Sequence, residues 1–170
     1  MDRNPVRLFV LMGVAGCGKS SYGTMLADRK SATFIDGDDF HPPANIAKMS
    51  AGIPLTDDDR WPWLDKVAAQ MIIPSGIVFV GCSALRKSYR EYLVSRAEMP
   101  MHFIYLAADR AMIDKRMASR DGHFMPTSLI DSQFAALEVP DDKEPSSLID
   151  INGSKDAVIS RIITAIDSII

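Results

Sequence analysis

Short apolar runs alternate with longer segments of mixed polarity along the chain. Most of the runs are apolar throughout, so they lack the strict alternation of a strand with one wet face. Nearly continuous apolar runs of this length are typical of strands buried on both faces of a parallel sheet. The pattern predicts five strands, at residues 8–12, 32–35, 77–80, 102–106 and 148–151.

The segments between these runs carry capping and turn residues, which predict helices. Thr56 is a good N-cap, and the three aspartates after it suit the positive end of a helix dipole. Pro62 must then lie in or near the first turn, because deeper in the helix it would remove a hydrogen bond. Residues 139–145 form an acidic, proline-bounded linker. The predicted helices span residues 19–28, 42–49, 57–73, 85–96, 109–119 (capped by Asp109), 127–137 (capped by Thr127 or Ser128) and 157–169.

This alternation predicts an α/β fold, with a parallel sheet covered by helices on both faces. At 170 residues, of which 47% are hydrophobic and 24% charged, the chain is expected to form one domain, residues 1–170. Its net charge of −3 argues against nucleic acid as a partner. No apolar run is long enough to cross a membrane, and the N-terminus lacks a signal-peptide core. We therefore expect a cytoplasmic protein without a membrane partner.

The strongest motif is a glycine-rich loop between the first predicted strand and the first predicted helix. Glycines let successive backbone N–H groups point at phosphate oxygens, and the helix start adds its positive dipole end. Lys19 would reach the β- and γ-phosphates of ATP, and the Ser20 hydroxyl would bind Mg²⁺. A chance glycine turn is the alternative. The loop matches the pattern G-x-x-x-x-G-K-S/T in full, with Gly13, Val14, Ala15, Gly16, Cys17, Gly18, Lys19 and Ser20.

Acidic residues follow the second predicted strand, which runs directly into Asp36 and Asp38. In an open α/β sheet, ligands bind beyond the carboxyl ends of the strands, so both carboxylates would face the site. One would help hold Mg²⁺ through water, and the other would orient or deprotonate the attacking hydroxyl. The alternative is a polar turn without a catalytic role.

A possible lid follows the fifth predicted helix. Arg116 and Arg120 flank the helix end and lead into a glycine-containing loop with His123, so residues 116–126 could form a mobile lid. The two arginines would then neutralise charge on the transferred phosphoryl group. A solvated helix end explains the same residues equally well.

Further basic residues could bind an anionic substrate. Arg86, Lys87 and Arg90 follow the third strand, where a helix N-terminus would face the site. A solvated helix face is the alternative for this group. Arg60 is another candidate for a substrate carboxylate. His41 contributes only if its loop lines the site.

In combination, these motifs resemble the gluconate kinases, or gluconokinases, of the shikimate-kinase-like P-loop group. The Asp-Gly-Asp with His-Pro at residues 36–42 and the Cys-Ser-Ala-Leu at residues 82–85 are far more specific to that family than the phosphate loop. The resemblance extends over about residues 8–140. The other matching stretches are residues 11–20, 45–46, 48–49, 52–55, 57–60, 62–64, 89–90, 122–124, 132–134 and 137–138.

The resemblance implies a three-layer P-loop fold with a five-stranded parallel sheet and a lid. It also implies a homodimer that uses ATP and Mg²⁺ to convert D-gluconate to 6-phosphogluconate. By analogy with shikimate kinases, Asp38 and Arg60 would contact the substrate, and Asp36 would lie nearer the metal. The expected catalytic residues are Lys19, Asp38, Arg116 and Arg120, and the expected substrate-binding residues are Asp38, His41, Arg60, Arg86, Lys87 and His123.

Two other functions stay open at this point. A kinase for another small hydroxy acid such as shikimate, or for a nucleoside or nucleotide, would share the phosphate loop. It would differ around residues 36–41 and 82–90. A nucleotide-binding regulatory protein would bind ATP without turnover, and the intact Lys19, Ser20 and Asp38 speak against it.

Overall fold

The computed structural model describes residues 5–119 and 126–170. Their five strands form one sheet in the order β2-β3-β1-β4-β5, and every neighbouring pair is parallel. The predicted α/β fold with a five-stranded parallel sheet is therefore confirmed. The strands are β1 (Leu8–Met12), β2 (Thr33–Asp36), β3 (Val78–Gly81), β4 (Met101–Ala107) and β5 (Ser146–Asp150).

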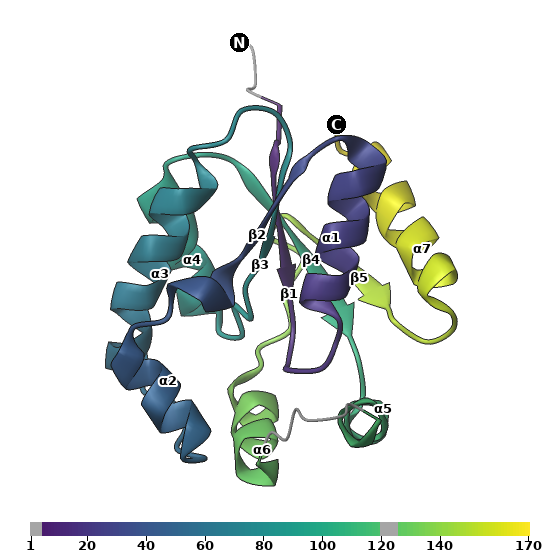
Figure 1. Cartoon of the computed structure of the whole chain (residues 1–170). Coiled ribbons are helices and arrows are strands. Elements are labelled where there is room, and N and C mark those ends of the chain that lie inside the picture. The colour runs from purple at the N-terminus through teal and green to yellow at the C-terminus, as the bar shows by residue number, and fades with distance from the viewer. Residues whose placement is uncertain (1–4, 120–125) are drawn as a thin grey trace.

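Helices cover both faces of this sheet (Figure 1). Helices α1 and α7 pack on one face, and α3 and α4 pack on the other. Helices α2, α5 and α6 lie near the carboxyl ends of the strands, at the bottom of Figure 1. The helices are α1 (Lys19–Lys30), the short 3-10 helix η1 (Gly37–Phe40), α2 (Pro43–Ser50), α3 (Asp57–Met71), α4 (Lys87–Ala97), α5 (Arg110–Ala118), α6 (Thr127–Ala136) and α7 (Lys155–Asp167).

The central strand β1 shows why the apolar runs are continuous. All five of its side chains are fully buried, and successive side chains point to opposite faces. Leu8, Val10 and Met12 belong to the core beneath α3 and α4, whereas Phe9 and Leu11 belong to the core beneath α1 and α7. A strand with two buried faces needs apolar residues at every position.

Two predicted helix caps are confirmed. The Thr56 hydroxyl accepts from Asp59 N, and the Asp59 carboxylate accepts from Thr56 N, which completes a capping box at the start of α3. Asp109 caps α5 by accepting from Met112 N at 2.8 Å. Pro62 lies in the second turn of α3, just beyond the predicted place, so its missing N–H leaves the helix one hydrogen bond short.

The predicted cap of α6 and the predicted start of α4 are wrong. Helix α6 has Pro126 at its N-cap, and neither Thr127 nor Ser128 caps it, because Thr127 is already the first helical residue. Helix α4 begins at Lys87 rather than at residue 85. Before it, Ala84 has a left-handed backbone with a φ of 44°, and Arg86 is extended, so the helix cannot begin earlier.

Two further expectations concern the membrane and the lid. Within residues 5–119 and 126–170, no helix is long and apolar enough to cross a membrane. Most of the predicted lid, together with Arg120 and His123, lies outside the described residues.

Candidate active site

The phosphate loop joins the end of β1 to the start of α1. Gly18 is the N-cap of α1 and has a φ of 103°, a conformation that favours glycine. A Cβ atom there would lie 2.5 Å from Cε2 of Tyr22, so any side chain would also clash. Within the described contacts, no side chain caps α1. Its first-turn N–H groups can therefore serve an anion, as the sequence predicts.

Lys19 and Ser20 begin α1 and face the same end of the site. The Lys19 ammonium donates to the carbonyls of Gly13 at 3.0 Å and Val14 at 3.1 Å. The Ser20 hydroxyl donates to Oδ2 of Asp36 at 2.7 Å. An ammonium, a hydroxyl and a carboxylate thus lie together at the loop, although Asp36 belongs to a different strand.

The Ser20–Asp36 pair fits the chemistry of Mg²⁺. This hard cation prefers oxygen ligands and usually keeps several waters and phosphate oxygens, so one or two protein oxygens are enough to hold it. Asp36 is also held in place, because its Oδ1 accepts from Asp38 N at 3.0 Å. The described residues contain no cluster of three or more His, Cys, Asp or Glu side chains, so a dedicated protein cage of that kind is absent from them.

A cleft of about 310 Å³ extends from this loop. Its volume is in the usual range for small-molecule sites. The phosphate loop forms one end, through Ala15, Gly16, Gly18, Lys19 and Ser20. The side chains that complete the wall include Asp38, His41, Arg60, Trp63, Ser83 and Gln133.

Asp38 lies on η1, directly after the strand that carries Asp36. Desolvation raises the pKa of its carboxyl, while the ammonium of Lys19 lowers it and the Asp36 carboxylate raises it. About 74% of the Asp38 side chain still contacts solvent in the open cleft. A substrate that covers this carboxyl would desolvate it further, so Asp38 suits the role of a proton acceptor.

Arg60 of α3 lines the cleft, and two hydrogen bonds fix its side chain. Its Nη1 donates to the carbonyl of Leu55 at 2.7 Å and to the hydroxyl of Tyr89 at 3.0 Å. The Tyr89 hydroxyl in turn donates to Asp57. The three aspartates at the start of α3 therefore include one that helps position a cleft arginine, beyond their effect on the helix dipole.

His41 lines the cleft beside Asp38. Its ring stacks on the indole of Trp63, with centroids 4.2 Å apart and 15° between the planes. The indole is fixed because its Nε1 donates to the carbonyl of Gly37 at 2.7 Å. Gly37 lies so close to β3 that a Cβ atom would be 2.5 Å from the carbonyl oxygen of Gly81. Trp63 thus packs in the core beneath α3 and α4 and also supports the site.

Gln133 of α6 is a site residue to which sequence reasoning gave no role. Its Oε1 accepts from Ala15 N, a phosphate-loop amide, at 2.6 Å. The two residues are 118 positions apart, so no local pattern could have paired them. The only available signal was the stretch at 132–134 in the family resemblance.

Three basic residues lie outside the cleft. Arg116 contacts the phosphate loop from the side, donating to the carbonyls of Cys17 at 3.2 Å and Ile151 at 3.3 Å. Nη1 of Arg86 lies 3.9 Å from Oδ2 of Asp57. Lys87 pairs with Asp141 at 2.9 Å. The substrate-binding roles predicted for Arg86 and Lys87 are not supported by this geometry.

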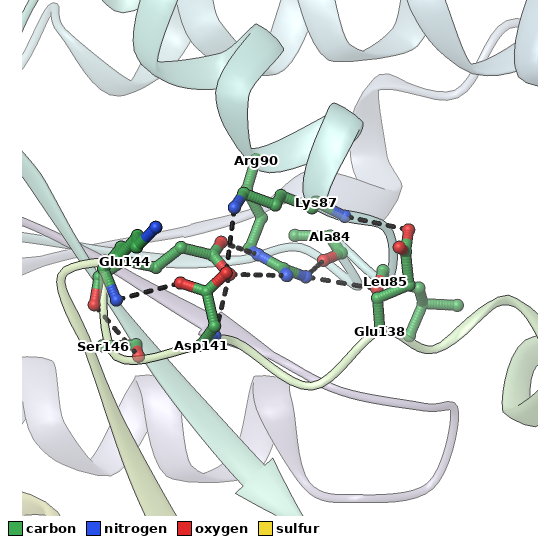
Figure 2. A network of polar contacts seen from close by, with 9 residues as sticks. Ala84, Leu85, Lys87, Arg90, Glu138, Asp141, Glu144 and Ser146 are labelled. Atoms are coloured by element: carbon green, nitrogen blue, oxygen red, sulfur yellow. Dashed lines mark hydrogen bonds and ion pairs between the residues drawn. The ribbon is translucent and has the colours of Figure 1, made fainter.

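Arg90 has a structural role (Figure 2). Its side chain is 1% exposed and pairs with Glu144 at 2.6 Å and 3.1 Å. Its Nη1 donates to the carbonyls of Ala84 and Leu85, in the loop that follows β3. The same loop is hydrogen-bonded to the phosphate loop, because Gly13 N donates to the carbonyl of Ser83 at 3.2 Å. The predicted linker 139–145 thus supplies Glu144 to hold the wall of the site.

Comparison with known proteins places this chain among enzymes of one activity. No protein-family model matches it. It is 47% identical to the thermosensitive gluconokinase of Escherichia coli over 85% of this chain and 79% of that protein. It is 45% identical to the gluconokinase of Gluconobacter oxydans over 92% and 89% of the two chains.

Solved structures agree. A gluconokinase from Sinorhizobium meliloti superposes with a TM-score of 0.88 at 40% identity, covering 98% of this chain and 94% of that one. A shikimate kinase from Aquifex aeolicus, at 13% identity and a TM-score of 0.60, shares the fold alone. The matches to these two curated enzymes extend over most of both chains. This chain therefore belongs to the gluconokinase family.

Proposed function

We propose that this protein transfers the γ-phosphoryl group of ATP to D-gluconate, giving 6-phospho-D-gluconate. The observation that carries the proposal is one continuous cleft with two chemically different ends. The phosphate loop forms one end, and a proton acceptor and an arginine, Asp38 and Arg60, line the rest. The relatives that bear the name gluconokinase support this choice of substrate.

At the nucleotide end, the loop amides and the Lys19 ammonium would neutralise charge on the phosphates. The Ser20 hydroxyl would hold Mg²⁺ directly, and Asp36 would hold it through water. When bound, the cation would supply further positive charge near the transferred phosphoryl group. Catalysis of this kind consists mainly of positioning and of electrostatic stabilisation, which the loop between β1 and α1 would provide.

At the acceptor end, Asp38 would orient the terminal hydroxyl of gluconate and accept its proton during in-line attack on phosphorus. Arg60 would bind the gluconate carboxylate, because guanidinium groups match carboxylates in shape and charge. Both contacts that hold Arg60 use Nη1, so its other N–H groups can serve the substrate. A homodimer and a cytoplasmic location stay predictions from the sequence.

A substrate panel tests the proposal. ATP and Mg²⁺ would be supplied with D-gluconate, shikimate or other sugar acids, and ADP release would be measured for each acid. We expect D-gluconate to give the highest kcat/KM. Lys19→Ala should lower that value by about 10²- to 10³-fold. Lys66→Ala, at an exposed position of α3, serves as the matched control. Nucleotide binding without turnover of gluconate, or preference for another acid, would refute the substrate assignment.

A further inference from the structure

Asn45 is a buried polar residue next to the site, with 3% of its surface exposed. Its Nδ2 donates to the backbone carbonyl of Asp59 at 3.0 Å. A carbonyl can only accept, so the amide group must present nitrogen on that side. The same Nδ2 lies 3.2 Å from Nδ1 of His41. Its second hydrogen therefore points at His41, and Nδ1 must be the unprotonated, accepting nitrogen of the ring.

The orientation of the His41 ring is fixed independently. The stack on Trp63 holds the plane of the ring, and the indole is anchored to Gly37. With Nδ1 accepting from Asn45, the proton of the neutral ring is on Nε2. Nε2 lies 3.8 Å from Oδ1 of Asp38. That separation is longer than an ordinary N–H···O hydrogen bond, so Asp38 does not engage this N–H group.

The charges around His41 act in opposite directions. The Asp38 carboxylate favours a protonated ring. Burial and the Arg60 guanidinium disfavour it, and these two effects lower the pKa of His41 to about 4. On the far side of Asn45, Lys48 pairs with Asp59 at 2.7 Å, so these two charges offset one another. A protonated Nδ1 would also direct its hydrogen at the amide hydrogens of Asn45.

We propose that Asn45 is a positioning residue that holds His41 in the neutral Nε2–H tautomer, and that this N–H group donates to a hydroxyl oxygen of the substrate beside the hydroxyl that Asp38 engages. The second half of the inference rests on the proposed function, because it requires a polyhydroxylated acid in the cleft. The first half concerns the free protein alone. A neutral donor suits a hydroxyl oxygen, while Arg60 provides the charge for the carboxylate.

Recognition of this kind predicts discrimination among substrates. A site whose donor is buried rejects an analogue that lacks the matching hydroxyl, since the donor is then left without a partner. Gluconate analogues with one hydroxyl removed should therefore include one that loses at least about tenfold in kcat/KM with the native protein. The same analogue should lose little more when His41 is already replaced by alanine.

The direct test is a long-range ¹H–¹⁵N spectrum of the histidine rings in the free protein. The chain has three histidines, so assignment needs only single replacements. We expect His41 to show an unprotonated Nδ1 and a protonated Nε2 from about pH 8 to about pH 5.5. Asn45→Asp replaces the donor by an acceptor and should move the proton of the neutral ring from Nε2 to Nδ1, which removes the Nε2–H donor. An Nδ1–H tautomer or an imidazolium in the native protein at neutral pH would overturn the inference.

Kinetics then separate a positioning role from a general structural one. Asn45→Asp should raise the KM for gluconate by about tenfold and leave the KM for ATP unchanged, as expected from loss of one substrate hydrogen bond. In a His41→Ala background, the same replacement should have little further effect. Ser50→Asp adds an equal charge at an exposed position of α2 and should change neither constant. Equal and additive losses in both backgrounds would show that Asn45 does not act through His41.

Discussion

Asp38 and His41 are neighbours whose pKa values shift in opposite directions, one up and the other down. Desolvation disfavours the charged form of each group, so it raises the pKa of the acid and lowers that of the base. At neutral pH the pair is therefore a carboxylate beside an uncharged ring. Asp38 thus escapes the pKa depression that an imidazolium would cause, and it stays the better proton acceptor.

The shift at His41 predicts how stability depends on pH. Its pKa is about 4 in the folded protein, against an ordinary value of 6.5. Between these values only the unfolded chain binds the proton, so the free energy of unfolding falls as pH falls. We expect His41 to contribute a loss of about 2 kcal/mol between about pH 7 and about pH 5. Urea unfolding of the native protein and of His41→Gln measures it, and an identical pH dependence in both would contradict the shift.

Single residues also show which parts of the site a sequence can reveal. The phosphate loop is contiguous, so its residue types predict its chemistry directly. Asp36 and Asp38 follow from strand ends, because ligands bind there in any parallel sheet. Lys87 shows the opposite. Its charge suggests an anion site, but its ammonium donates to Asp141, a partner 54 residues away in the sequence. Pairings over such distances leave no pattern in the sequence.

At the level of elements, α6 and the phosphate loop are coupled through one hydrogen bond. Gln133 accepts from the amide of Ala15, and the motif directs such amides at phosphate oxygens. A nucleotide phosphate and the Gln133 carboxamide therefore compete for the same donor. Just beyond the C-terminus of α6, the chain is attached to the wall of the site, where Glu138 N donates to the carbonyl of Leu85 at 2.8 Å.

This competition gives a prediction for Gln133→Ala. Loss of one neutral hydrogen bond in the free protein removes about 1 kcal/mol that ATP must otherwise displace. We expect ATP to bind about fivefold more tightly to the variant, as measured by calorimetric titration. Gln70→Ala, at an exposed position of α3, is the control and should bind ATP as the native protein does. Unchanged or weaker binding by Gln133→Ala would show that the carboxamide assists the nucleotide instead.

Elements were predicted well where a local signal defines them. The five strands are marked by their apolar runs. The N-cap of α3 depends on a hydrogen bond between Thr56 and Asp59, which are only three residues apart. The start of α4 was misplaced because it depends on the loop before it. There, Arg90 holds the carbonyls of Ala84 and Leu85 from within the helix, and Glu144 neutralises that arginine. Sequence patterns do not report such tertiary contacts.

The whole molecule assembles the cleft from segments that are distant in sequence. Strand β1 is central, so its loop opens at the middle of the sheet edge, with β3 on one side and β4 on the other. After α1 the chain forms β2, whose last residue, Asp36, accepts a hydrogen bond from the Ser20 hydroxyl. Helix α2 adds Met49 to the lining of the cleft, α3 adds Arg60, and α6 adds Gln133. A nucleotide end and an acceptor end are therefore adjacent by virtue of the topology.

The central claim is that Asp38 in this cleft accepts the proton of gluconate, and adjacent aspartates test it most directly. Asp38 lines the cleft, whereas Asp39 is exposed on the same turn. With ATP, Mg²⁺ and D-gluconate, 6-phosphogluconate would be followed through its NADP-dependent dehydrogenase. The account predicts that Asp38→Asn lowers kcat by about 10²- to 10⁴-fold and that Asp39→Asn stays within about twofold of the native protein. Equal kcat values for the two variants, or no phosphorylation of gluconate by the native protein, would contradict it.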